Sequence, residues 1–253
     1  MKKLIVFSIL LLACISCNAQ AKLPDENFQE TQDDNLVKIY QKFKENQHDY
    51  GENARDTILN RFRSSLLRTL KDPKFSNYTF DNLKKEMLIK SSKDNKLMVV
   101  SWDELNGGTW KIFNSAYRYQ KGNKIYVDYL AKEIKTDGKI DFTDVNYYKI
   151  YKIKEDNYLV LGYGTHGHGH EFYTMRLMKF KENSLQDCKN CFDKKDQLVL
   201  YKTRGGDDSI TYDPDQLKIQ YPEYVEDKET GFMKSTGNTI TLIYKDNGFA
   251  KVK

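Results

Sequence analysis

The stretch Asn157–Phe180, NYLVLGYGTHGHGHEFYTMRLMKF, holds two apolar runs joined by a link rich in glycine and histidine. The first run, Tyr158–Leu161, is made of residues that suit a pleated, buried surface. The second run, Phe172–Phe180, alternates between two sets of side chains, which is the period of a β-strand. Glycine tolerates positive φ, so the glycines of the link allow the chain to reverse. The stretch is therefore predicted to form a β-hairpin.

Further strand-like runs surround this hairpin between about residue 91 and residue 253. Turn signals rich in Gly, Asn and Asp separate the runs, and strands do not alternate with helices. The pattern predicts an antiparallel β meander over 91–253, folded as a sandwich or an open barrel. The runs are Leu97–Trp102, Trp110–Tyr119, Ile125–Leu130, Tyr147–Ile153, Leu198–Tyr201, Ile210–Tyr212, Leu217–Tyr221, Thr239–Tyr244 and Phe249–Val252.

The segment 35–90 has a helical period instead, and we expect it to pack on the β domain, which makes the chain α+β overall. One helix is predicted around Leu36–Phe43, a second over Asn53–Lys71 and a short third one over Phe80–Met87. The second helix carries arginines mostly off its apolar stripe. They are interpreted as a solvated face, with contact to an anionic surface as the alternative; these residues are Arg55, Arg61, Arg63 and Arg68.

The N-terminus reads as an export signal over residues 1–20. Two lysines precede Leu4–Ala13, an apolar run too short to span a bilayer, which needs about 20 residues. Cys14 follows a lipobox-like sequence and Cys17 is a second candidate for lipidation, whereas Ala19–Ala21 resembles an ordinary cleavage site. We expect an outer-membrane lipoprotein or a periplasmic protein, with secretion as the alternative, and contact with membrane only through that lipid.

The polar residues 21–34 are predicted to be a flexible tether between this signal and the helices. The full chain has a net charge of +5, and loss of Lys2 and Lys3 with the signal leaves +3. A nucleic-acid-binding domain would show a much more basic stripe, so no nucleic-acid partner is expected. The 18 tyrosines suit a β-rich protein, or a binding face lined by aromatic rings.

Side chains that can coordinate a metal are concentrated in one place in the sequence, the histidine-rich link of the central hairpin. His166, His168 and His170 are two residues apart, and Glu171 follows them. In an extended strand, neighbouring members of this set lie about 6.6 Å apart on one face. At this spacing two neighbouring imidazoles can coordinate one metal ion, and a curled turn would bring in the third. Glu171 would be a fourth ligand or a hydrogen-bond partner of a ligand. Zinc or another transition metal is the candidate cofactor; a solvated turn and a pH-responsive patch are the alternatives.

Cys188 and Cys191 have CxxC spacing. In an oxidising compartment this spacing predicts a small local disulfide. A thioredoxin-type site would require a βαβ context that the surrounding sequence lacks. The cysteines are also expected to lie too far along the return strand to share a metal with the histidine turn.

The segment Ser101–Thr109, SWDELNGGT, resembles a strand–turn–strand signature of uncharacterised exported or lipidated β-rich proteins of Gram-negative bacteria. The resemblance covers roughly Phe80 to the C-terminus. It implies a β-rich exported protein and supplies no activity or catalytic residue. Trp102 and Trp110 flank the glycine turn and are predicted to pack across it as a cross-strand pair, with ligand stacking as the alternative.

Three functional hypotheses follow. The first is a cell-envelope or secreted binding module that recognises an envelope protein or glycan. The second is a metal-binding protein or metal-dependent hydrolase that uses the histidine turn, in which bound Zn²⁺ would activate water. The third is a structural envelope component. The chain carries no GxSxG elbow, Walker loop, HExxH or dinucleotide fingerprint, so no catalytic residue is assigned and an enzymatic activity is left open.

Overall fold

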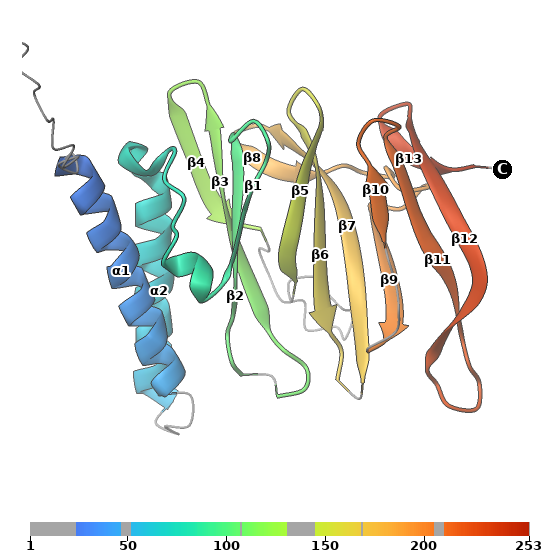
Figure 1. Cartoon of the computed structure of the whole chain (residues 1–253), viewed down its shortest axis with the longest axis horizontal. Coiled ribbons are helices and arrows are strands. Elements are labelled where there is room, and N and C mark those ends of the chain that lie inside the picture. Colours follow the sequence, from blue (N-terminus) through green and yellow to red (C-terminus); the bar gives the residue numbers. More distant parts are fainter. Residues whose placement is uncertain are drawn as a thin grey trace, which may run out of the picture.

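The computed structural model describes residues 24–46, 52–106, 108–130, 145–167, 169–204 and 210–252. Two antiparallel helices form one end of the molecule, and three sheets follow in chain order (Figure 1). The helices are α1 (Pro24–Glu45) and α2 (Glu52–Lys71), followed by single 3-10 turns at Pro73–Phe75 and Leu83–Lys85. The helix predicted over Asn53–Lys71 is therefore confirmed, and the one predicted over Phe80–Met87 is reduced to one 3-10 turn.

The first sheet is β1 (Leu88–Ser91), β2 (Leu97–Asp103), β3 (Phe113–Lys121) and β4 (Lys124–Tyr129), in that order. The second contains β5 (Asn146–Lys154), β6 (Asn157–Thr165), β7 (His170–Lys181) and β8 (Ser184–Asp187), with β9 (Gln197–Thr203) also paired to β7. The third is β10 (Thr211–Asp213), β11 (Lys218–Glu226), β12 (Met233–Lys245) and β13 (Gly248–Lys251). Neighbouring strands are antiparallel and no sheet is closed, which confirms the mainly antiparallel β prediction with a helical N-terminal part.

The helical part begins earlier and ends earlier than predicted. Helix α1 starts at Pro24, so the flexible tether predicted for 21–34 is wrong from that residue onward, and 21–23 lie outside the described residues. Tertiary contacts order this polar stretch: the Phe28 ring lies 6.0 Å from the Phe75 ring, and Asp33 is fully buried. Strand β1, which pairs with β2, begins at Leu88 and therefore inside the segment 35–90 that was predicted to be helical.

Strand β2 explains how the first sheet joins two layers. Its run of four apolar residues is buried throughout, as is typical of strands covered on both faces. Met98 and Val100 pack in the cluster that contains Phe62 of α2. Leu97 and Val99, which alternate with them, pack in the cluster shared with the second sheet. The helices and the second sheet therefore cover opposite faces of the first sheet, as Figure 1 also shows.

Strand β6 repeats the arrangement one layer further on. Tyr158 and Val160 face the first sheet, whereas Leu159 and Leu161 share a cluster with Leu242 of the third sheet. The β6–β7 hairpin predicted from the sequence is present in antiparallel register. The fold is thus a stack of one helical layer and three open sheets, and the expected sandwich packing holds between consecutive layers.

A buried cation ties the first sheet to the 3-10 turn that follows α2. Arg118 on β3 is only 2% exposed, and its guanidinium donates hydrogen bonds to the carbonyl oxygens of Phe75 and Ser76. Burial lowers the pKa of Arg118 to about 10. The two carbonyl acceptors offset the cost of placing this charge between the layers.

The two tryptophans of the SWDELNGGT segment do not pair, so the predicted cross-strand contact is wrong. Trp102 is 1% exposed and meets the Phe62 ring of α2 edge-on at 5.7 Å. Trp110 is 41% exposed and lies in the loop before β3. Asp103 pairs with Phe113 in the ladder, so β3 starts three residues later than predicted and Trp110 is outside the sheet.

Candidate functional site

The histidine turn joins β6 to β7 at one end of the second sheet. The backbone N–H of His166 donates to the carbonyl oxygen of His170 at 3.0 Å, and the His170 N–H donates to the carbonyl oxygen of Gly167 at 2.8 Å. Gly167 and Gly169 have φ values of 68° and 82°, which glycine adopts without strain. The glycine-rich link thus makes the chain reversal that the sequence predicts.

The described members of the predicted metal site do not converge. The His166 ring lies edge-on to Trp110 at 4.5 Å, and the His170 ring stacks on Phe232 at 5.0 Å. Glu171 makes an ion pair with Lys202 of β9 at 3.0 Å. His170 and Glu171 are consecutive in a strand, so their side chains project to opposite faces. His168 lies outside the described residues, and those that are described contain no group of three or more potential metal ligands.

Cys188 and Cys191 are joined by a disulfide in the loop between β8 and β9. The Phe249 N–H donates to the carbonyl oxygen of Cys191 at 2.6 Å, which fastens this loop to β13. A Cβ on Gly248 would lie 2.9 Å from that oxygen, so the close approach requires glycine. The lipidation candidates Cys14 and Cys17 lie outside the described residues.

A groove of about 790 Å³ opens beside the SWDELNGGT loop, and we call it the end groove. It runs from the C-terminal half of α1, across β2, to the β5–β6 end of the second sheet. Its volume is within the range of ligand sites. Its lining residues are Tyr40, Lys44, Lys84, Lys85, Glu86, Met87, Leu88, Ser101, Trp102, Asp103, Leu105, Gly108, Thr109, Lys111, Phe113, Asn146, Tyr163, Thr165 and Arg204.

Cations outnumber carboxylates in the end groove. Lys44 pairs with Glu86 at 2.8 Å and Lys111 pairs with Asp103 at 3.0 Å. The remaining cations are Lys84, Lys85 and Arg204. Lys84 forms an ion pair with Asp81 at 3.4 Å, and Lys85 donates to the Asn82 side chain at 2.8 Å; both partners directly precede the 3-10 turn. The end groove therefore has an excess of positive charge and favours an anionic ligand.

The floor of the end groove holds an unsatisfied amide. Asn146 is 9% exposed, and its Nδ2 donates to the Tyr163 hydroxyl at 3.1 Å. Its Oδ1 is buried and has no hydrogen-bond partner among the described residues. Beside it, the Thr165 hydroxyl accepts from the Lys111 N–H at 2.8 Å. A buried acceptor without a partner costs about 1–3 kcal/mol, so a water or a ligand hydroxyl is expected at Asn146.

Three tyrosines of the second sheet form a contiguous aromatic face next to this floor. The ring centroids of Tyr148, Tyr163 and Tyr173 lie 6.2–6.4 Å from one another. Lys202 lies over the Tyr173 ring at 5.1 Å. Burial raises the pKa of Tyr148 to about 12, so its phenol stays protonated. Of these three rings, Tyr163 is the one that lines the end groove.

The loop that borders the end groove is fixed to α2 by Glu104. Glu104 is 6% exposed; its carboxylate pairs with Arg63 and accepts from Asn114 Nδ2 at 3.0 Å. Arg55 donates to the Glu104 carbonyl oxygen at 2.6 Å. The interpretation of the arginine flank as a solvated face is therefore wrong for Arg55 and Arg63. Nothing in the spacing of these residues identifies Glu104 as their shared partner.

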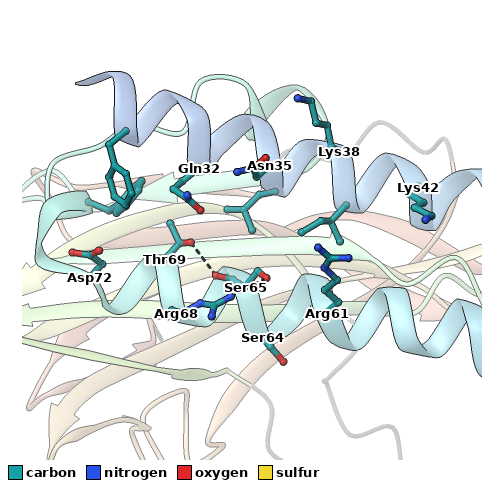
Figure 2. Close-up of a pocket in the computed structure, with 14 residues that line it drawn as sticks. Gln32, Asn35, Lys38, Lys42, Arg61, Ser64, Ser65, Arg68, Thr69 and Asp72 are labelled. Carbon is teal, nitrogen blue, oxygen red and sulfur yellow. Dashed lines mark hydrogen bonds between the residues drawn. The ribbon is translucent and has the colours of Figure 1, made fainter. Parts of the chain in front are cut away.

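A second groove, also of about 790 Å³, lies between α1 and α2, and we call it the helical groove (Figure 2). The other two arginines of the flank, Arg61 and Arg68, line it from α2, opposite Lys38 and Lys42 of α1.

Comparison of the chain with family models, curated proteins and solved structures gave no match. No helix in the described ranges is long and apolar enough to cross a membrane.

Proposed function

We propose that the protein is an exported binding module of the cell envelope, and that its end groove binds an acidic glycan. The observation that carries this proposal is the combination of excess cations with an unpartnered Asn146 Oδ1 in one groove. Export is supported by the two lysines and the apolar run at the N-terminus. Lipid anchoring is supported by the presence of Cys14 and Cys17 close after that run.

The chemistry of the groove suits a hydroxyl-rich anion. Asn146 Oδ1 is an acceptor for a sugar hydroxyl, and the Thr165 hydroxyl lies in the same wall. Tyr163 offers an aromatic ring with a polar end beside them. Lys85 and Arg204 supply charges for carboxylates on the glycan, and an arginine binds a carboxylate in two-pronged geometry.

Binding describes the end groove better than catalysis does. The titratable side chains of its wall are mostly engaged in pairs, as in Lys44–Glu86 and Lys111–Asp103. General acid–base chemistry on a sugar uses two carboxylates on either side of the bond that breaks. The carboxylates that line the groove, Glu86 and Asp103, each have a lysine partner. The hydrogen bond from Lys44 lowers the pKa of Glu86.

The test is titration calorimetry of the protein with uronic-acid-containing oligosaccharides, beside neutral ones of the same length. The variant Lys85→Gln/Arg204→Gln is expected to bind the acidic ligand at least about tenfold more weakly. Asn146→Ala is expected to weaken acidic and neutral ligands alike, because it removes a hydroxyl partner and no charge.

The matched control is Lys124→Gln/Lys181→Gln, which removes two cations at the opposite end of the sheets (Figure 1). It should bind as the unmodified protein does. Equal affinity for acidic and neutral oligosaccharides, or equal weakening in the control, would contradict the proposed ligand class. Retained melting temperatures would show that the variants are folded.

A further inference from the structure

The helical groove is open to solvent along the end layer of the molecule. Its walls come from α1 and α2, and most of its rim residues are exposed. Leu36 and Phe75, both 1% exposed, form an apolar floor. Phe28 lies at the end of the groove where α1 begins, and it is 40% exposed. The groove thus combines a cationic rim with an apolar patch.

Four cations line the rim with little to neutralise them. The side chains of Lys38, Lys42 and Arg61 have no ion-pair or hydrogen-bond partner among the described residues, and the Arg68 guanidinium donates to the Ser65 hydroxyl at 3.4 Å. One carboxylate, Asp72, also lines the groove, and it accepts from the Lys74 N–H at 3.0 Å. The residues that line the groove therefore carry a net charge of +3.

The cations are arranged in two rows rather than around one point. Lys38 and Lys42 are one helical turn apart on α1, a rise of about 6 Å. Arg61 and Arg68 are seven residues apart on α2, which gives a rise of about 10.5 Å. In Figure 2 the Arg61 side chain extends from α2 toward α1. Such spacing fits several phosphate groups side by side better than a single bound anion.

We propose that the helical groove binds the phosphate headgroups of an anionic phospholipid surface. Lysines and arginines close to such a surface each contribute to binding, and their contributions add up. The exposed Phe28 ring suits the interface between headgroups and acyl chains. The groove would then orient the protein on a membrane, with the helical layer toward the lipid and the sheets away from it.

The position of the groove in the chain supports this partner. If Cys17 or Cys14 carries a lipid, six or nine residues separate it from Pro24. A fully extended chain of that length spans about 20–30 Å, so the anchor would hold α1 near the bilayer. This step rests on the export and anchoring proposed above, but it is independent of the ligand of the end groove.

The test is flotation of the chain without its export signal, residues 21–253, with phosphatidylcholine vesicles that contain about 30% phosphatidylglycerol, beside pure phosphatidylcholine vesicles. This protein lacks the apolar run Leu4–Ala13, which would bind vesicles by itself, and it lacks Cys14 and Cys17, so no lipid anchor contributes. The groove variant is Lys38→Gln/Lys42→Gln/Arg61→Gln/Arg68→Gln. The matched control is Lys93→Gln/Lys124→Gln/Lys181→Gln/Lys245→Gln, which removes the same charge from exposed positions in a turn or at the end of a strand.

The protein and the control variant are expected to bind the anionic vesicles, and the groove variant at least about tenfold more weakly. Added salt should weaken the binding, because it screens exposed charges. Equal vesicle binding by groove and control variants would overturn the proposal. So would a dimer in sedimentation that the groove variant loses, since a second copy would then occupy the groove. Neither result bears on the glycan titration, which uses variants outside this groove.

Discussion

The carboxylate of Asp33 on α1 accepts a hydrogen bond from the backbone N–H of Leu83 at 3.0 Å, across 50 residues of chain. Its second oxygen accepts from the Asn82 N–H at 3.0 Å and from the Tyr78 hydroxyl at 3.3 Å. Asp33 is therefore a side-chain cap for the start of the 3-10 turn at Leu83–Lys85, supplied by a different helix. This contact fixes the path by which the chain leaves the helical layer and enters β1.

Replacing Asp33 by Ala is expected to destabilise the protein by roughly 3 kcal/mol, because two buried N–H groups lose their acceptor. Urea unfolding followed by circular dichroism measures the change. Asp81→Ala is the control, since Asp81 is exposed shortly before the same turn and should change stability by less than about 0.5 kcal/mol. Similar losses for the two variants would show that Asp33 does not act as a cap.

The burial of Asp33 also has a consequence for pH dependence. Desolvation raises the pKa of this carboxyl above its ordinary value of 3.8, although its hydrogen bonds act in the opposite direction. A raised pKa means that the folded state binds the proton more tightly than the unfolded state does. The contribution of Asp33 to stability is therefore largest below about pH 4 and falls as the pH rises through the raised pKa.

This pH effect is measured as the difference in unfolding free energy between the unmodified protein and Asp33→Asn, from pH 3 to pH 7. The amide does not titrate, so the difference should change with pH in the direction given above. A difference that stays constant across this range would show that the Asp33 pKa is the same in both states.

The ion pair between Glu104 and Arg63 should be strongly coupled. Glu104 is buried, and removing either partner leaves the other charge in a part of the protein with little water. A double-mutant cycle with Glu104→Ala and Arg63→Ala is expected to give a coupling energy of about 1–3 kcal/mol. Additive losses would mean that the two side chains act separately. The exposed pair Lys189–Asp196 serves as the comparison and should give less than about 1 kcal/mol.

The histidine turn is expected to hold no stoichiometric metal. His166, His170 and Glu171 have separate partners in Trp110, Phe232 and Lys202, and moving them together would break these contacts. Native mass spectrometry of tag-free protein, purified without a metal column, measures this directly. The expectation would be contradicted by one zinc ion per chain that the variant His166→Ala/His168→Ala/His170→Ala loses. His168 would then be the ligand around which the site is built.

The Cys188–Cys191 disulfide closes a short loop, so its loss should be mild. Chain-entropy arguments give roughly 2 kcal/mol for a loop of this length. Cys188→Ser/Cys191→Ser should lower the unfolding free energy by about that amount, and reduction of the unmodified protein should have the same effect. A much larger loss in the serine variant than on reduction would show that the hydroxyls, not the missing bond, disturb the contact with β13.

Several elements of the fold could be predicted from local sequence, for identifiable reasons. The runs at Leu97–Val100 and Tyr158–Leu161 are apolar throughout, because each strand is covered on both faces. The stripe of α2 repeats at helical spacing, because one side of the helix faces the first sheet. In these elements local preference and tertiary environment agree, so the pattern alone identifies them.

Other elements depend on contacts that are distant in sequence. Residues 24–34 are polar, and they are helical because Phe28 and Asp33 meet the turns after α2. Tryptophan has a high preference for strands, but Trp110 lies in the loop before β3, where it contacts His166. The end groove could not be predicted either, since Asn146, Lys85 and Arg204 come from three separate segments.

The sequence by itself determined the fold class, the helical start and the central hairpin, because strand and helix periods are properties of neighbouring residues. The tertiary structure decided how the layers stack, which arginines are engaged and where the charged grooves lie. Those features depend on side chains tens of residues apart that meet only when the sheets pack, as Arg63 meets Glu104. The histidines were the conspicuous feature of the sequence, and packing gives His166 and His170 separate aromatic partners.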